Sequence, residues 1–145
     1  MKNLIKSFFL SLIGMTFLTN CEKEEIISSL DLPVEINSYI STHFPNKSIL
    51  QVIKDKDGLI KSYDILLNEN VSLEFNRKNE IIDIDANTKL PDSVIPDKIL
   101  QFVALKYAAN FVTDWQLDGN NQQVELDNGL DLEFNIKGEF LRIDN

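Results

Sequence analysis

One stretch of 14 residues occurs twice in this chain of 145 residues. The stretch at 72–85 reads SLEFNRKNEIIDID, the stretch at 131–144 reads DLEFNIKGEFLRID, and 8 of the 14 aligned positions are identical. Apolar and polar residues alternate on both sides of Lys-Asn or Lys-Gly, and this alternation is typical of a β-hairpin. The repetition therefore predicts two copies of one structural unit rather than a single irregular domain.

A two-residue turn at Lys78-Asn79, and at Lys137-Gly138 in the second copy, would fix which side chains share a face of each hairpin. The predicted apolar pairs are Phe75 with Ile82, Leu73 with Ile84, Phe134 with Leu141 and Leu132 with Ile143. The predicted pairs on the other face are Glu74 with Asp83, Glu133 with Arg142 and Asp131 with Asp144. A shift of the strand pairing by one residue would expose the apolar side chains to water. The sequence of this hairpin is therefore the most constrained part of each repeat.

A helix is predicted ahead of the strands in each copy. In LPVEINSYISTHFP the helical spacing is met by Ile36, Tyr39, Ile40, His43 and Phe44, and in IPDKILQFVALKYAANF by Ile99, Phe102, Val103, Lys106 and Tyr107. After each helix the period becomes two, with turns predicted at Asp57-Gly58 and near Asp118-Gly119-Asn120 and with three-residue connections at 68–70 and 127–129. Each copy therefore has one helix and four strands.

These patterns predict an α+β fold of two tandem repeats, residues 31–86 and 87–145, each with a helix packed on a four-stranded antiparallel meander sheet. A unit of about 55 residues hides only about 60% of its unfolded surface and is marginally stable alone. We therefore expect the two repeats to support each other, through joined sheet edges or a shared core.

The N-terminus has the composition of an export signal. Residues 1–20 carry Lys2 and Lys6, no acid, and an apolar run over 8–18 that is too short to cross a bilayer. We interpret residues 1–20 as a signal peptide and residues 21–30, which begin CEKEEII, as an acidic tether.

The segment Leu18-Thr19-Asn20-Cys21 resembles a lipobox, and Cys21 is the only cysteine. This resemblance implies lipid attachment at Cys21 and an outer-membrane lipoprotein, facing the periplasm or the cell surface. Asn20 departs from the pattern, because a small residue is usual there, so an ordinary secretory signal followed by an unmodified cysteine is the alternative.

The two copies together resemble the PepSY-like family, also called β-lactamase-inhibitor-like. The resemblance rests on Leu32, Pro33, Ile36, Ile40, Phe44, Pro45 and Asp57-Gly58 in the first copy, and on Pro96, Ile99, Val103 and Tyr107 in the second. At the position equivalent to Pro45, the second copy has Ala108. It implies secreted, often lipid-anchored, non-catalytic domains with relatives that inhibit enzymes. No inhibitory loop can be transferred onto named residues.

Composition excludes some classes of partner and gives no catalytic set. A net charge of −9 disfavours nucleic acid and anionic membranes, so any membrane contact is expected through the lipid anchor alone. The single histidine, His43, has no recognisable nucleophile motif beside it, and DKDG at 55–58 lacks two ligand positions of a calcium loop. We predict neither enzymatic activity nor a cofactor or bound metal.

The candidate binding residues are Trp115 and the charged hairpin residues Glu74, Asp83, Asp85, Glu133 and Arg142. The acids could bind a cation or a basic partner, or simply be solvated, and Trp115 could be an interface residue or part of the core. The leading hypothesis is a protein-binding module that recognises another envelope or secreted protein, for example as inhibitor of an exported peptidase or hydrolase. The alternatives are a binder of small ligands or cations, and a structural spacer of a surface complex.

Overall fold

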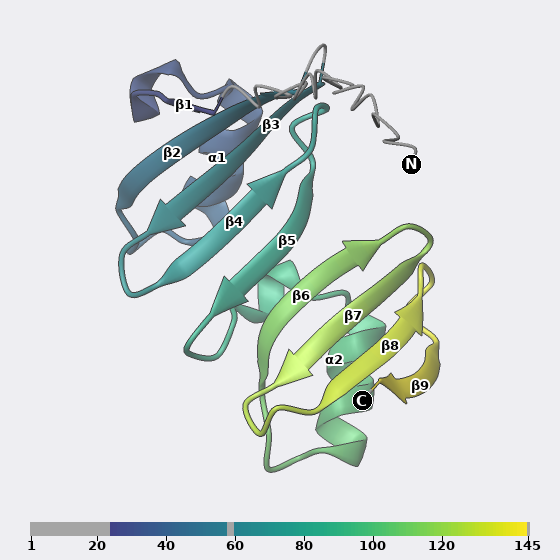
Figure 1. The fold of residues 1–145 in the computed structure, drawn as a ribbon. Coiled ribbons are helices and arrows are strands. Elements are labelled where there is room, and N and C mark those ends of the chain that lie inside the picture. Colours follow the sequence, from purple (N-terminus) through teal and green to yellow (C-terminus); the bar gives the residue numbers. More distant parts are fainter. Residues whose placement is uncertain (1–23, 58–59, 145) are drawn as a thin grey trace, which may run out of the picture.

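The computed structural model describes residues 24–57 and 60–144, which form two α-helices, two short 3-10 helices (η1 and η2) and one sheet of nine strands (Figure 1). The first half contains β1 (Glu25–Ile26), η1 (Ser29–Asp31), α1 (Val34–His43), β2 (Ile49–Asp57), β3 (Ile60–Leu67), β4 (Val71–Phe75) and β5 (Ile81–Ala86). The second half contains η2 (Asp92–Val94), α2 (Asp97–Lys106), β6 (Val112–Asp118), β7 (Asn121–Leu126), β8 (Asp131–Asn135) and β9 (Phe140–Asp144).

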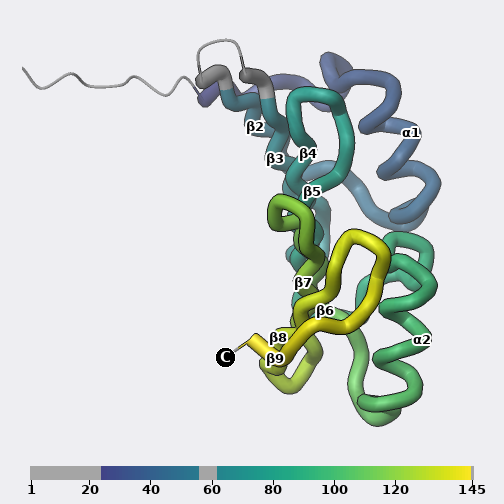
Figure 2. The backbone as a smooth tube through the Cα atoms, turned by 90° about the vertical axis from the view of Figure 1, so that its right-hand side faces the viewer, coloured from purple at the N-terminus to yellow at the C-terminus, as the bar shows by residue number. Residues whose placement is uncertain are grey.

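The nine strands follow one another in sequence order, and every neighbouring pair is antiparallel. Strand β5 pairs with β6, so the two halves share one continuous sheet, which confirms the expectation of joined sheet edges. Both helices lie on the same side of this sheet, and no described helix covers the opposite side (Figure 2). The fold thus has two layers and one open sheet face.

The core lies between the helices and the sheet because each helix has one apolar stripe. Ile36 and Ile40 of α1, and Ile99 and Val103 of α2, are buried. Alternate strand residues meet them, including the fully buried Phe75 and Phe134, and the other residues of the same strands point to the open face. Pro33 and Pro96 directly precede the two helices, at the N-cap positions.

The last hairpin of each repeat has a three-residue loop, so the prediction of a two-residue turn is wrong. The side-chain oxygen of Asn76 accepts hydrogen bonds from the backbone N–H groups of Lys78 and Glu80, at 2.8 and 3.1 Å. Asn79 takes a positive φ of 64°, and its N–H donates to the carbonyl of Asn76. The asparagine side chain closes this loop, which makes the loop one residue longer than the alternation suggested.

A bulge next to the loop absorbs the extra residue. Phe75 therefore pairs with Ile81 rather than Ile82, and Phe134 with Phe140 rather than Leu141. Beyond the bulge, the predicted pairs Leu73–Ile84, Glu74–Asp83, Leu132–Ile143, Glu133–Arg142 and Asp131–Asp144 are all present.

The segment expected to be an acidic tether is partly folded. Glu25 and Ile26 form β1 and pair with Lys54 and Ile53, and the N–H of Ile27 donates to the carbonyl of Val52 at 3.1 Å. The tether prediction therefore fails for 25–30, because the outer edge of β2 offers backbone partners there. The predicted signal peptide, Cys21 and Gly58 of the predicted turn lie outside the described residues.

The junction between the repeats is filled by Trp115. This side chain is 7% exposed, sits opposite Ile84 of β5 and Val124 of β7, and donates from Nε1 to Oε1 of Gln122 at 3.0 Å. Gln122, itself buried, donates in turn to the carbonyl of Asn135. Trp115 is therefore a core residue with a satisfied N–H group, on the helix side of the sheet.

We expect Trp115→Val to lower the free energy of unfolding by about 3 kcal/mol, because it leaves a cavity at the junction and removes the partner of Gln122. Urea unfolding followed by circular dichroism measures this loss. Leu117→Val, a smaller truncation on the same strand at a half-buried position, serves as the control. A loss below about 1 kcal/mol for Trp115→Val would contradict the assigned role of the indole.

Candidate binding surface

A row of polar side chains crosses the open face of the sheet from strand to strand. Directly paired positions place one residue of each strand from β3 to β9 in this row, in the order Asp64, Glu74, Asp83, Gln116, Gln123, Glu133 and Arg142. Directly opposite residues on one face of an antiparallel sheet have Cβ atoms about 5 Å apart. The row is therefore a continuous strip.

A second row runs beside the first, two residues along each strand. It contains Ser72, Asp85, Asp114, Glu125, Asp131 and Asp144, again in directly paired positions from β4 to β9. We call the two rows together the acidic face. Where β5 meets β6, Asp85 lies opposite Asp114, so the boundary between the repeats brings two like charges together.

The carboxylates at the centre of the acidic face are harder to ionise than isolated ones. Partial burial, followed by the charges of Asp83, Asp85, Glu125 and Asp131, raises the pKa of Asp114 to about 7. The charge of Asp114 therefore changes near neutral pH.

Three neighbouring carboxyls are shifted in the same direction. Partial burial is the first cause for each, and nearby acids add to it: Asp55 and Glu24 raise the pKa of Asp64, Asp64 and Asp83 that of Glu74, and Asp85 and Asp64 that of Asp83. A hydrogen bond with Gln116 offsets part of the rise at Asp83. The acidic face therefore stores like-charge repulsion that a positively charged partner would relieve.

The C-terminal end of the acidic face is neutralised within the chain. Arg142 Nε lies 2.6 Å from Oε2 of Glu133, and an Nη atom lies 3.5 Å from Oδ2 of Asp144. Glu133 also accepts a hydrogen bond from Asn121 at 2.6 Å. The unbalanced negative charge is therefore concentrated over β3 to β8, around the junction of the repeats.

The structure brings together five of the six predicted surface residues and separates the sixth. Glu74, Asp83 and Asp85 lie side by side on β4 and β5, and Glu133 and Arg142 extend the same face on β8 and β9. Trp115 lies in the core on the other side of the sheet, so its assignment to a binding surface is wrong.

The predicted binding residues did not include four acids of the acidic face: Asp64, Asp114, Glu125 and Asp131. Each is polar at an alternating position, which was a usable signal. The sequence left open whether joined sheet edges or a shared core would connect the repeats, and it gave no register. The pairing of β5 with β6 is what brings acids of the two repeats next to each other.

His43 helps to join the repeats on the helix side. It ends α1, its Nδ1 lies in a 2.9 Å hydrogen bond with Oγ of Ser93 in η2, and its ring lies 4.4 Å from that of Tyr39.

Within the described part of the chain, no group of three or more His, Cys, Asp or Glu side chains could hold a metal ion. Across those same residues, no helix has the length and apolar character needed to cross a membrane.

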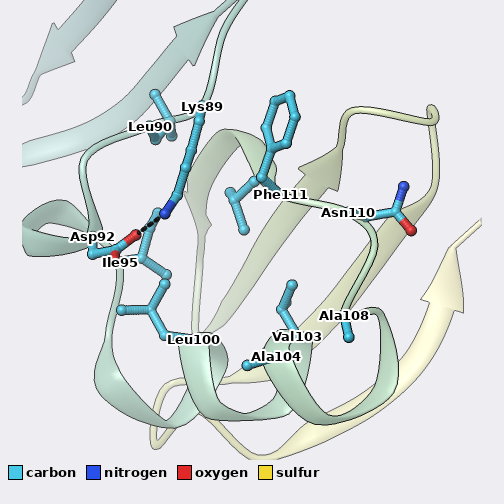
Figure 3. Close-up of a pocket in the computed structure, with 11 residues that line it drawn as sticks. Lys89, Leu90, Asp92, Ile95, Leu100, Val103, Ala104, Ala108, Asn110 and Phe111 are labelled. Atoms are coloured by element: carbon cyan, nitrogen blue, oxygen red, sulfur yellow. Dashed lines mark ion pairs between the residues drawn. The ribbon is translucent and has the colours of Figure 1, made fainter.

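An apolar hollow lies beside α2 and has a volume of about 330 Å³ (Figure 3). Leu90, Ile95, Leu100, Val103 and Phe111 contribute to its lining. Two polar side chains at its rim are paired with each other, since Lys89 Nζ lies 2.8 Å from Oδ1 of Asp92, and Asn110 donates to Asp127. A ligand site usually offers polar groups that converge on the ligand, so the acidic face is the stronger candidate.

The family model described as "Putative beta-lactamase-inhibitor-like, PepSY-like" matches the chain twice, over residues 17–83 and 61–142. The chain belongs to the PepSY-like family. The two matches correspond to the two tandem repeats of this PepSY-like protein and overlap in 61–83, which runs from β3 into β5. Among curated proteins, none matches the sequence.

Solved structures of Bacteroides proteins share the PepSY-like fold. One from Bacteroides vulgatus, titled a "putative periplasmic protein" of the DUF2874 family, has 27% identity and a TM-score of 0.80, covering 86% of this chain and 99% of its own. A "putative calcium-regulated periplasmic protein" from Bacteroides thetaiotaomicron has 26% identity and a TM-score of 0.79, covering 84% and 97%. A second Bacteroides vulgatus protein, of unknown function, has 27% identity, a TM-score of 0.79 and coverage of 85% and 100%.

The raised pKa of Asp114 makes stability depend on pH. Because this pKa is about 7 in the folded chain and 3.8 in the unfolded reference, the folded state binds the extra proton between these values, and stability falls as pH rises from about 4 to 7. We expect the melting temperature to fall over this window and Asp114→Asn to flatten the decrease. Differential scanning fluorimetry measures both, with Asp118→Asn on the same strand as the control. An unchanged slope in Asp114→Asn would contradict the assignment.

Proposed function

We propose that this PepSY-like protein is a non-catalytic binding module of the cell envelope, and that its acidic face binds a positively charged surface of another protein. The observation that carries the proposal is the continuity of the two polar rows across the joined repeats. The proposed partner is an exported protein such as a peptidase or other hydrolase, which the module would restrain.

The dimensions of the acidic face favour a protein over a small molecule. Neighbouring strands are about 4.8 Å apart, so the part of the first row that runs from Asp64 on β3 to Glu133 on β8 is roughly 24 Å long. A standard interface buries about 800 Å² on each partner, an area of comparable width. No described helix covers this face, whereas small-molecule sites are enclosed clefts that bury most of the ligand.

The charge of the face favours a basic partner. Burial in an interface would strip water from carboxylates whose pKa values are already raised, and lysine or arginine side chains of a partner would compensate for that cost. Positive charge on the partner would also accelerate encounter, since the field of the acidic face attracts it from a distance.

The location in the proposal is that of a lipoprotein of the outer membrane, facing the periplasm or the cell surface and anchored through Cys21. It rests on the lipobox-like segment before Cys21 and on the periplasmic titles of the structural relatives. Metabolic labelling with a fatty-acid analogue tests the anchor, with Cys21→Ser as the variant that should lose the label.

We expect an affinity column that carries the chain from Glu22 onward to retain a specific basic protein from solubilised envelope or culture supernatant. The variant Asp83→Asn, Asp114→Asn, Glu125→Gln should bind this protein at least tenfold more weakly, because it removes three acids from the acidic face. Mass spectrometry identifies the protein and biolayer interferometry gives its dissociation constant at several salt concentrations.

The matched control removes the same charge from the helix side through Asp31→Asn, Glu35→Gln and Asp97→Asn. Its binding should equal that of the unmodified chain. Equal weakening by both triple variants would mean that net charge, not the acidic face, attracts the partner. Retention within a fixed membrane complex, with no soluble enzyme, would favour the role of a structural spacer.

A divalent cation is a second candidate ligand of the same face. It is favoured by the cross-strand pair of Asp85 and Asp114, and one structural relative is titled as calcium-regulated. Since no described cluster can hold a metal ion by itself, binding would be weak and would act mainly by reducing repulsion.

For the cation, we expect millimolar calcium to raise the melting temperature of the chain, and Asp83→Asn with Asp85→Asn to abolish the rise. Magnesium at the same concentration separates specific binding from screening. No shift with calcium at pH 7.5, where the acids are most ionised, would rule this candidate out.

A further inference from the structure

The two outer edges of the sheet differ. Strand β2 is covered by β1, which pairs with Lys54 and Ile53. Strand β9 pairs with β8 on one side, and no described strand lies on its other side. Open edges of this kind expose unpaired backbone N–H and carbonyl groups, together with the apolar side chains Phe140, Leu141 and Ile143.

Strand β5 shows how the same position is covered inside the chain. Residues 83–85 of β5 correspond by repeat alignment to residues 142–144 of β9, and these three positions of β5 pair with 114–116 of β6. Ile84 is 0% exposed under this cover, whereas its counterpart Ile143 is 44% exposed. An equivalent segment is thus paired and buried in one repeat and open in the other.

We propose that a second copy of this chain covers β9, with two β9 strands paired antiparallel about a two-fold axis at Ile143. In that register Ile143 lies opposite the partner's Ile143, and Arg142 lies opposite the partner's Asp144. The two-fold axis generates each contact twice, so the dimer has two such Arg–Asp pairs. The same three positions that join β5 to β6 would then join two molecules.

Charge complementarity selects this register. Ile143 shares the face of Leu132, which packs toward the helices, and Arg142 shares the acidic face, so an allowed register must keep both faces matched. Moving the axis to Arg142 would place two arginines opposite each other. With the axis at Ile143, Arg142 meets Asp144 of the second copy in addition to its contacts with Glu133 and Asp144 of its own chain. The side chains of Arg142 and Asp144 are 62% and 46% exposed, so both remain accessible to the second copy.

The other self-association of edges is blocked. A head-to-tail contact would pair β9 of one copy with β2 of the next, as β5 pairs with β6 inside the chain. Strand β1 and the hydrogen bond from Ile27 N–H to the carbonyl of Val52 already occupy that edge of β2. The described edges therefore allow a closed two-fold dimer rather than an open chain of molecules.

The contact is small, so the dimer should be in exchange with monomer. Three registered pairs bury far less than the roughly 1,200 Å² of a stable standard interface. We expect a dissociation constant in the micromolar range or weaker, rising with salt because two exposed ion pairs contribute. Sedimentation velocity of the chain from Glu22 onward, which holds the whole described fold, measures it as a function of concentration and salt.

Single charge reversals test the register. Arg142→Asp and Asp144→Arg should each raise the dissociation constant of the dimer at least tenfold and leave the chain monomeric. Each variant places like charges opposite each other at both positions where an Arg–Asp pair would form. An equal mixture of the two variants should form a heterodimer, because one copy then presents two acids and the other two arginines. Lys137→Asp, in the loop of the same hairpin, is the control and should dimerise like the unmodified chain.

A cysteine at the axis tests the geometry without altering charge. The chain from Glu22 onward lacks Cys21, so in Ile143→Cys the introduced thiol is unique and meets its own copy across the axis. Mild oxidation should give a covalent dimer, while Leu105→Cys on the exposed surface of α2 should remain largely monomeric.

A chain that stays monomeric to millimolar concentration overturns the proposal. So does a dimer that persists in both single reversals, or a mixture of folded variants that fails to associate. If a reversal variant is unfolded by circular dichroism, the cysteine experiment alone decides between a two-fold contact at Ile143 and none.

Discussion

The antiparallel pairing of β5 with β6 is the contact on which the rest of this structure depends. It joins two units of marginal size into one sheet, gives Ile84 and Trp115 their common burial, and sets the two helices on the same side. The pairing also brings Asp85 opposite Asp114. The strand contact that completes the core is thus the contact that concentrates charge on the open face.

One face of the sheet must be apolar to pack against the helices, and the other is polar and faces solvent. Successive side chains of a β-strand point to opposite faces, so alternating apolar and polar residues satisfy both. Leu73 and Ile84 pack toward the helices, while Glu74, Asp83 and Asp85, next to them in the chain, face solvent. The buried face is filled almost entirely by apolar side chains, with Gln122 satisfied by Trp115 and Asn135. The open face carries groups that remain partly unsatisfied electrostatically, and it is there that a partner can contribute most.

Much of the fold could be predicted from local patterns. The helices, the α+β class and most hairpin pairs follow from periodicity and from the repeated stretch, and the family was indicated by the motif residues that resemble it. The loop at 76–80 could not be read in this way, because the side chain of Asn76 closes it and a bulge compensates beyond it. The repeat itself held a clue, since Asn76 and Glu80 recur as Asn135 and Glu139 with the same hydrogen bonds.

The candidate surface was predictable where its residues pair within one hairpin, and not where they pair between the repeats. Pairs inside one hairpin, such as Glu133 with Arg142, depend on nearby residues, whereas Asp85 and Asp114 meet only through a contact between repeats. The strand β1 was missed because two residues have no periodicity to detect. Trp115 could be either core or interface by type, and only its place at the junction decides for the core.

The single tryptophan also makes the order of the two copies irreversible. At the position equivalent to Trp115, the first copy has Val52. On its outer edge the strand of Val52 has only the two-residue β1 beside it, whereas Trp115 pairs with Ile84 of the six-residue β5. A circular permutant with the copies exchanged would leave the indole beside a two-residue strand and a valine at the centre of the molecule. Because of the difference at this position, the two copies are not interchangeable, although their last hairpins have the same pairing.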